Sequence, residues 1–312
     1  MIRLFLFTLS AAFYFIGISV CNADYMPMDN MAPGNPRMQA VGQELDKIEA
    51  SRDRRQVVPA SGIVPKNTEL EFSSELYWAK YDEPKIFSQK GFMSGYNARY
   101  AHRLSTDPNS IINMIGLQAQ WASGKFKEPA YEGPSGIKDL TYDLRGVIGK
   151  DLYPTSKLRT TGYLGYGFRY LKDDSEGLDS DIDGFTLLGY KRYSHYNYLP
   201  FGVDIAYQLD PFYSLESNLE YDYMFYGWQV SKLGVVPGYS TLIVDQRYGS
   251  GLRASIRLNL NAKNFTAFAE WFYRYWNINQ SKSKPDPTDP TFSLFEPKNN
   301  TQEFGLRLGV QI

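Results

Sequence analysis

Apolar and polar residues alternate through the last nine positions of the chain. Phe304, Leu306, Leu308, Val310 and Ile312 are apolar, and the positions between them carry Gly, Arg, Gly and Gln. A period of two places one set of side chains on each face of a β-strand. The alternation therefore predicts a strand with one apolar and one polar face that runs to the last residue.

The same period recurs from Glu69 onward and predicts an antiparallel β-barrel of about ten strands, with eight or twelve as alternatives. The longest expected strand contains Pro200, a residue that sheets tolerate mainly at bulges and edges. We therefore expect a bulge near Pro200 or a break into a hairpin near Tyr193–Tyr196. The expected strands are Glu69–Tyr81, Gly91–Leu104, Ser110–Ser123, Ile137–Asp151, Lys157–Leu171, Gly184–Gln208, Tyr213–Ser231, Leu242–Leu260, Asn264–Ser281 and Thr301–Ile312.

Short and long connections alternate between these strands. The short ones are 105–109, 152–156, 209–212 and 261–263, and the long ones are 82–90, 124–136, 172–183, 232–241 and 282–300. Short turns at one end and long loops at the other are typical of barrels that span a bacterial outer membrane. This pattern predicts an even number of strands, with both termini in the periplasm.

Composition favours a membrane barrel over the alternative, a Tyr-rich soluble β-sandwich. Aromatic residues make up 16% of the chain, 25 of them Tyr, and Tyr and Trp concentrate at the two lipid–water interfaces of such barrels. After residue 20 no apolar run reaches 18 residues, so no helical span is expected there. The balance of 33 Lys+Arg against 34 Asp+Glu argues against a nucleic-acid partner.

The N-terminal part predicts export. Residues 1–23 have the basic start, apolar run and small-residue end of a signal peptide. Its Cys21 is the only cysteine, and lipidation of Cys21 is the alternative. Residues 24–66 are expected to form a periplasmic leader with a short amphipathic helix, Met38–Gln56, through which copies of the chain could pair. Residues 67–312 are expected to form the barrel.

Parity also assigns side chains to the two faces of the strands. On strand 213–231, Leu215, Leu219, Tyr221, Tyr223 and Phe225 are expected to face lipid. In a barrel of about ten strands, opposite charges from facing walls can meet in the lumen and plug it. The alternative is a selective path for a small ion or solute. Sixteen charged side chains are expected to face the lumen: Glu71, Glu75, Arg99, Arg103, Asp139, Asp143, Arg145, Arg159, Arg169, Glu216, Glu220, Arg253, Arg257, Glu270, Arg274 and Arg307.

The sequence offers little catalytic chemistry. The two histidines, His102 and His195, have no acidic residue at a spacing that suggests a catalytic pair. Zinc motifs, phosphate-binding loops and nucleophile elbows are absent from the sequence. We therefore expect no catalytic residue, no cofactor and no metal.

The segment Glu69–Ile312 resembles the bacterial outer-membrane β-barrel proteins in its alternating strands, unequal loops, aromatic content and terminal strand Phe304–Ile312. The class usually ends in Phe or Trp, whereas this chain ends in Ile312. The resemblance implies a Gram-negative outer membrane, contact with lipid and lipopolysaccharide, and recognition of the last strand by the barrel-assembly machinery. In strand number and protruding strands the chain looks like the omptin-type barrels. Omptin proteases use an Asp pair opposite an Asp–His pair, and no such pattern surrounds His195.

Three functions are compatible with this reading. The first is a non-enzymatic barrel that acts as a small porin-like channel or as a structural surface protein. The second is an adhesin or receptor that binds through the outer loops Gly124–Gly136, Lys172–Asp183 and Lys282–Asn300. The third is an omptin-like protease, which would need His195 with acids such as Asp181 and Asp183.

Overall fold

The computed structural model describes residues 66–84, 86–104, 110–128, 135–182 and 185–312. The expected signal peptide, the leader and the helix Met38–Gln56 lie outside these residues. Within them, no helix is long and apolar enough to cross a membrane.

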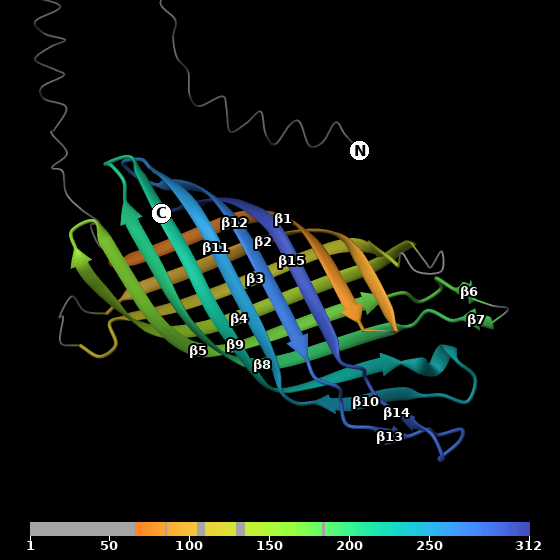
Figure 1. Cartoon of the computed structure of the whole chain (residues 1–312). Helices are drawn as coiled ribbons and strands as arrows, with labels where there is room; N and C mark the ends of the chain where they lie inside the picture. The colour runs from red at the N-terminus through yellow and green to blue at the C-terminus, as the bar shows by residue number, and fades with distance from the viewer. Residues whose placement is uncertain (1–65, 85, 105–109, 129–134, 183–184) are drawn as a thin grey trace, which may run out of the picture. The chain divides into compact units, whose positions relative to one another are not determined.

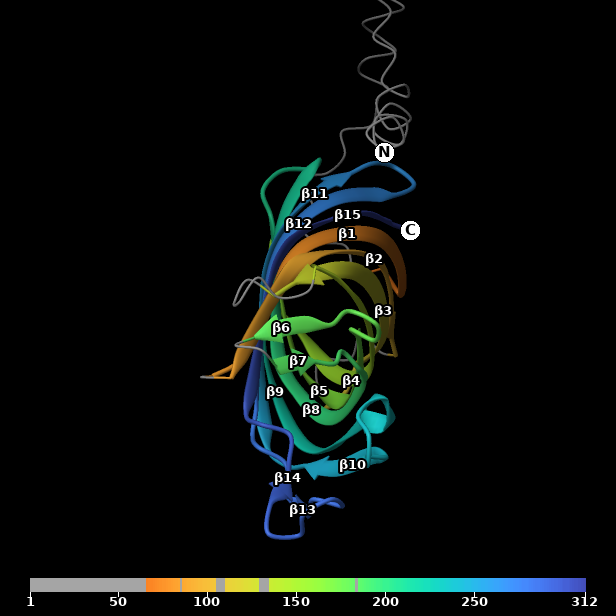
Figure 2. The same cartoon turned by 90° about the vertical axis from the view of Figure 1, so that its right-hand side faces the viewer.

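Ten antiparallel strands close into a barrel in the described part of the chain (Figures 1 and 2), which confirms the predicted fold class and strand number. Neighbours along the sequence pair with each other, and pairing of β1 with β15 joins the first strand to the last. The barrel strands are β1 (Thr68–Glu83), β2 (Phe87–Arg103), β3 (Met114–Lys127), β4 (Ser135–Thr155), β5 (Leu158–Asp174), β8 (Lys191–Gln208), β9 (Tyr213–Lys232), β11 (Gly249–Asn261), β12 (Thr266–Ile278) and β15 (Asn299–Gln311).

The two ends of the barrel differ. We call the end of the barrel that holds Ile312 the near end and the opposite end the far end. At the near end, Leu70 N donates to Ile312 O at 3.1 Å and Ile312 N donates to Leu70 O at 2.9 Å, which ties the end of the chain to β1. At the far end, short elements extend beyond the ring of strands (Figure 1). These elements are β6 (Ser180–Ile182), β7 (Phe185–Leu187), the 3-10 turn η3 (Leu233–Val235), β10 (Thr241–Gln246), β13 (Lys284–Pro285) and β14 (Ser293–Leu294).

Several predicted boundaries are wrong at the far end. The loop expected at 82–90 is a tight hairpin, because β1 and β2 stay paired as far as Glu83 and Phe87. The polar residues Glu83 and Gln89 suggested a loop, but both are buried inside the barrel wall. At the near end of the barrel, β3 begins at Met114, whereas the prediction began this strand at Ser110.

Two long predicted strands are interrupted. The strand expected at 184–208 is divided into β7 and β8 by residues 188–190, ahead of the predicted break at Tyr193–Tyr196. The β8–β9 register shifts between Asn197 and Tyr198, close to Pro200, but the extra residue lies in the partner strand β9 and not in the strand where the bulge was expected. The strand expected at 242–260 is divided into β10 and β11 at Tyr248, whose φ of 64° turns the chain. β10 then continues along β9 beyond the reach of β11.

The bulge also corrects one predicted face. Asn197 pairs with Tyr226 and Tyr198 pairs with Met224, so Phe225 has no partner in the ladder. Phe225 is half-buried instead of fully lipid-facing, and Tyr226 takes the next outward position. An extra residue in one strand reverses the parity of everything that follows it.

Apolar side chains fill part of the interior in two clusters. One contains Tyr77, Ala79, Met93, Ala122, Phe126, Ile137 and Phe272, and the other contains Tyr196, Tyr198, Met224, Trp276 and Ile278. Gly95 lets β2 and β3 approach beside the first cluster, because a Cβ there would lie 2.0 Å from Trp121 O and 2.6 Å from Ala122 Cβ. Charged side chains occupy the rest of the lumen.

Candidate functional site

Arginine–carboxylate pairs form the candidate site inside the barrel. Of the sixteen side chains predicted to face the lumen, fifteen take part in arginine–carboxylate ion pairs in the structure, and Asp139 is the exception. Asp139 lies beside Asp173 in the β4–β5 ladder, and its buried Oδ1 has no hydrogen-bond partner among the described residues.

Several of these pairs cross the lumen. Arg169 on β5 donates from Nη2 to Glu303 Oε1 on β15 at 2.5 Å. Four strands separate β5 from β15 in either direction around the barrel, so this pair joins opposite walls. Arg253 on β11 likewise reaches Asp143 on β4 at 2.7 Å. The side chains of Arg169 and Glu303 are both only 4% exposed, so the contact lies away from water.

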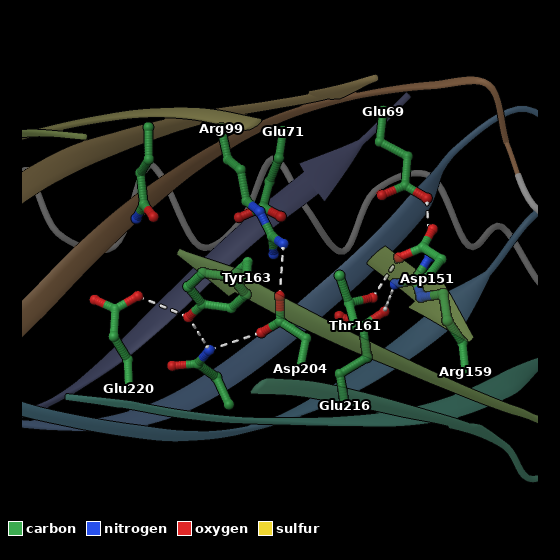
Figure 3. A network of polar contacts seen from close by, with 12 residues as sticks. Glu69, Glu71, Arg99, Asp151, Arg159, Thr161, Tyr163, Asp204, Glu216 and Glu220 are labelled. Atoms are coloured by element: carbon green, nitrogen blue, oxygen red, sulfur yellow. Dashed lines mark hydrogen bonds and ion pairs between the residues drawn. The ribbon is translucent and has the colours of Figure 1, made fainter. Parts of the chain in front are cut away.

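A second group of cross-lumen contacts lies towards the near end (Figure 3). Arg99 on β2 reaches Asp204 on β8 at 3.1 Å, and Asn218 Nδ2 donates to the other oxygen of Asp204 at 2.7 Å. Tyr163 OH donates to Glu220 Oε2 at 2.6 Å. Each carboxylate thus accepts hydrogen bonds from more than one strand, which is what a buried charge requires.

The last group sits at the near end itself. Arg103 Nε donates to Asp151 Oδ2 at 2.5 Å, and Arg103 Nη1 lies 2.8 Å from Glu69 Oε1. Arg159 approaches the same Glu69 oxygen at 3.4 Å. Figure 3 shows Asp151 between Glu69 and Thr161 in this group.

Aromatic rings cover the guanidinium faces that carboxylates leave free. Arg257 lies 4.0 Å from the centre of the Phe268 ring, and Arg274 lies 4.4 Å from that of Phe272. Arginine can present its edge to carboxylates and its face to a ring, whereas lysine offers only a point charge. In keeping with this, the ion pairs that cross the described lumen use arginine.

Little space remains between these side chains. Two cavities in the described lumen have volumes of about 80 and 10 Å³. The larger is lined by Arg99, Tyr163, Asp204, Arg253 and Arg257, among others. Such spaces have room for a few water molecules.

A separate charged cluster closes the far end around Arg192. Its guanidinium lies 2.7 Å from Glu83, 3.1 Å from Asp173 and 3.8 Å from Glu296. Burial raises the pKa of Glu296 to about 7, and Glu83 adds to that shift. Arg192 opposes the shift, but its nearer partners already compete for its charge. Three carboxylates therefore share one cation.

Sequence reasoning missed several partners in these groups. Asp204 and Glu303 lie on inward positions, and their parity could have been read in the same way as that of Arg307. Glu83 and Asp173 were hidden because the predicted strands ended before them. Arg192 lies within the predicted strand 184–208, and its inward position was not recognised. Pairing across the lumen has no signal in sequence spacing.

His195 lies on the outer face of the wall. Its ring stacks on Trp228 with centroids 4.4 Å apart and meets the edge of Tyr170 at 5.1 Å. Asp183 lies outside the described residues, as does the side chain of Asp181, so the acids of the protease hypothesis are not placed. His102 contacts Thr68 Oγ1 through Nδ1 at 2.9 Å. No group of three potential metal ligands occurs in the part of the chain that the structure describes.

Comparison with known proteins identifies the fold. No protein-family model matches the sequence, and no curated protein matches it significantly. The outer membrane protease OmpT from Escherichia coli superposes with a TM-score of 0.52 at 12% identity, over 80% of this chain and 97% of that one. The fold is that of an outer-membrane β-barrel.

Two further solved structures are similar at lower TM-scores. The toluene transporter TbuX from Ralstonia pickettii has a TM-score of 0.40 at 8% identity, over 81% of this chain and 90% of that one. The translocator domain of the autotransporter NalP from Neisseria meningitidis has a TM-score of 0.38 at 10% identity, over 88% and 96%.

The pair Arg169–Glu303 generates a stability prediction. Glu303→Gln should lower the free energy of unfolding by about 3–5 kcal/mol, because it leaves a buried guanidinium without its carboxylate. In the Glu303→Gln variant, adding Arg169→Met should lower the free energy of unfolding by less than Arg169→Met does in wild type, since the two side chains act as one unit. Urea unfolding from lipid vesicles measures both effects. Glu176→Gln is the control, because its pair with Lys191 is exposed and should contribute under about 1 kcal/mol. Equal effects of Glu303→Gln and Glu176→Gln would contradict the prediction.

Glu296 generates a pH prediction. Because its pKa is about 7 in the folded protein and 4.5 ordinarily, the unfolded chain ionises first as the pH rises. The free energy of unfolding should therefore fall between about pH 4.5 and pH 7, by at most about 3 kcal/mol from this group. The temperature at which the folded band disappears on a gel, measured across this range, tests it.

Glu296→Gln should reduce the fall in the free energy of unfolding that accompanies the rise in pH, because it removes the titrating group. Asp286→Asn is a control with the opposite sign, because hydrogen bonds from Thr288 and Tyr239 lower the pKa of Asp286 to about 2. Ionised Asp286 therefore adds to the free energy of unfolding above about pH 4, and this stabilisation disappears only as the pH falls towards about 2. An unchanged pH profile in Glu296→Gln would show that another group causes the dependence.

Proposed function

We propose that the protein is an integral outer-membrane barrel with a plugged lumen, acting as a non-enzymatic structural surface protein. The observation that carries the proposal is the Arg169–Glu303 contact between opposite walls. An open channel needs a continuous watered path, whereas here paired charges and apolar clusters occupy the interior.

The outer face supports placement in a bilayer. Large apolar side chains lie exposed all around the wall, such as Phe92 (65%), Leu117 (62%), Ile256 (55%) and Phe304 (58%). A soluble protein rarely exposes so continuous an apolar surface. In this proposal the longer connections lie at the cell exterior, as is usual for such barrels, so the far end faces outward and both termini lie in the periplasm.

A continuous aromatic row supports the same placement. Tyr96, Trp121, Tyr142, Tyr170, His195 and Trp228 occupy one register row across β2, β3, β4, β5, β8 and β9. Aromatic side chains on the outer wall are typical of barrels that meet a lipid–water interface. His195 therefore has a membrane role in this proposal. Recognition of β15 by the barrel-assembly machinery belongs to the same proposal.

Planar-bilayer recording tests the plug. The refolded chain without residues 1–23 should give no discrete current steps, because the cross-lumen pairs leave no continuous path. Circular dichroism and a heat-dependent gel shift must first show a folded barrel. Steps from folded wild-type protein would contradict the plug and favour the channel. Failure to insert into lipid under any condition would contradict the membrane assignment.

A second candidate function is binding of another surface through the far end. Phe292 is 66% exposed there. Hydrogen bonds to Asp286 hold the connection between β13 and β14 in which Phe292 lies. Asp286 accepts from Thr288 N at 2.7 Å and from Tyr239 OH at 2.7 Å. A large apolar side chain held outward on a fixed loop is a common recognition feature.

Adherence of bacteria that express the protein to an epithelial cell layer tests this second function. Phe292→Ser should reduce adherence several-fold, because it removes the exposed ring from the loop. Phe212→Ser is the matched control, since Phe212 is 62% exposed in the turn at the near end. Equal adherence of both variants, of wild type and of cells without the protein would rule out adhesion.

A further inference from the structure

Two buried carboxyl groups lie side by side at the far end of the barrel. Glu83 ends β1, and Glu296 lies in the connection between β14 and β15. Tyr81 OH lies 2.9 Å from Glu83 Oε1 and 3.3 Å from Glu296 Oε1, so its single proton can serve only one of them at a time. The two glutamates are only 4% and 5% exposed. We call Glu83 and Glu296 the carboxyl pair.

The guanidinium beside the carboxyl pair is already occupied. Arg192 Nη1 lies 2.7 Å from Glu83 Oε1 but 3.8 Å from Glu296 Oε1. Arg192 Nη2 lies 3.1 Å from Asp173 Oδ2, and the face of the guanidinium lies 4.8 Å from the centre of the Phe87 ring. Glu83 and Asp173 therefore take the short contacts, and Glu296 is left with the long one.

The other titratable groups around the carboxyl pair add no positive charge. Within the described chain, Arg192 is the only cation that forms an ion pair with Glu296. Asp139 lies opposite Asp173 in the β4–β5 ladder, and its buried Oδ1 has no hydrogen-bond partner among the described residues. The groups that face this cluster are Tyr81 of β1, Glu128 after β3, Asp139 of β4, Asp173 of β5, Tyr190 before β8 and Tyr196 of β8.

Glu296 also attaches a long connection to the barrel wall. Its backbone N donates to Ser281 Oγ at 2.8 Å, and Ser281 N donates to the backbone O of Glu296 at 2.9 Å. These two bonds join the ends of the segment 281–296, which contains β13 and β14 beyond the ring of strands (Figure 1). A bond from Lys282 N to Asp245 O attaches the same segment to β10 at 3.0 Å. The side chain of Glu296 is the attachment to β1.

One proton decides whether this attachment is stable. When Glu296 is neutral, its carboxyl can stay buried beside ionised Glu83 without a second cation. When both are ionised, two like charges compete for Tyr81 OH and Arg192, and exposure of one of them to water is favoured. Glu296 is the member that moves, because Glu83 keeps the shorter contact with Arg192 and lies on a strand that is paired with β2.

We propose that the carboxyl pair is a pH-dependent latch, which holds the segment 281–296 against β1 while the pair keeps one proton and releases it when both carboxyls are ionised. Burial raises the pKa of Glu296 to about 7 from its ordinary 4.5, and Glu83 adds to the shift. The ratio of held to released forms should therefore fall by up to about 10-fold per pH unit between about pH 4.5 and pH 7, and level off above. The latch goes beyond the plugged barrel, because it controls the position of the segment that carries Phe292.

The distance between two spin labels tests the latch. The refolded chain without residues 1–23 contains no cysteine, so Ser293→Cys on β14 and Lys90→Cys on β2 place one label on the segment and one on the wall. Both native side chains are exposed, so the labels should not disturb the cluster. Double electron–electron resonance from about pH 4.5 to about pH 8 should show one narrow distance in acid and a second, broader population that grows towards neutral pH.

Two substitutions separate a latch from a purely structural contact. Glu296→Gln should keep the narrow distance at every pH, because the amide cannot ionise. Glu83→Gln should also keep it, because ionised Glu296 then has Arg192 nearby and no charged neighbour at Tyr81. Glu176→Gln is the matched control at the same end, since its carboxylate is exposed and pairs with Lys191, and it should respond to pH as the otherwise unmodified labelled chain does.

Two outcomes would overturn the inference. One is a distance distribution that does not change with pH in the folded, labelled chain that carries both glutamates, and this titration decides even if a variant does not fold. The other is an unchanged pH response in both Glu296→Gln and Glu83→Gln, because another group would then move the segment. Either result leaves the proposed plug standing, since the carboxyl pair takes no part in the Arg169–Glu303 contact. Current steps from the folded barrel would contradict the plug and leave the latch standing.

Discussion

The structure depends on one constraint: an ionised side chain inside the wall must find an opposite charge within the width of the barrel. Ten strands set that width, and Arg and Glu side chains from facing walls are long enough to meet across it. The pairs Arg169–Glu303 and Arg253–Asp143 show the result, with short contacts between strands that are distant around the ring. The choice of arginine follows from the same constraint, because its edge serves carboxylates while its face packs on rings such as Phe268 and Phe272.

The two faces of the wall follow opposite rules. Inside, most charged side chains are paired and rings pack between them, so little free space remains. Outside, apolar side chains and an aromatic row leave wide exposed surfaces. Recognition in such a molecule is expected on its outer wall and far end, where the chain has not satisfied its own groups.

Much of the barrel could be predicted from alternation alone. The terminal strand, the number of strands and the inward positions of residues such as Arg253 and Arg257 follow from a period of two, which the whole sheet shares. Prediction failed where that period breaks. The unpaired Phe225 reverses parity within β9, and the positive φ of Tyr248 divides one expected strand into two. Glu83 and Asp173 look like loop residues until Arg192 is seen between them. Which charge meets which across the lumen depends on how the sheet is rolled, and no local pattern records this.

The ion pairs of the interior join residues far apart in the chain: Arg169 with Glu303 over 134 positions, Glu71 with Arg257 over 186, and Glu75 with Arg307, on the neighbouring strands β1 and β15, over 232. An open sheet with the same strands would carry all of these charges unmatched towards hydrocarbon. Closure of the ring and neutralisation of its interior are therefore the same event. Partly rolled forms gain little until the last strand docks, so the barrel should form in one cooperative step whose rate is limited by its most distant contacts.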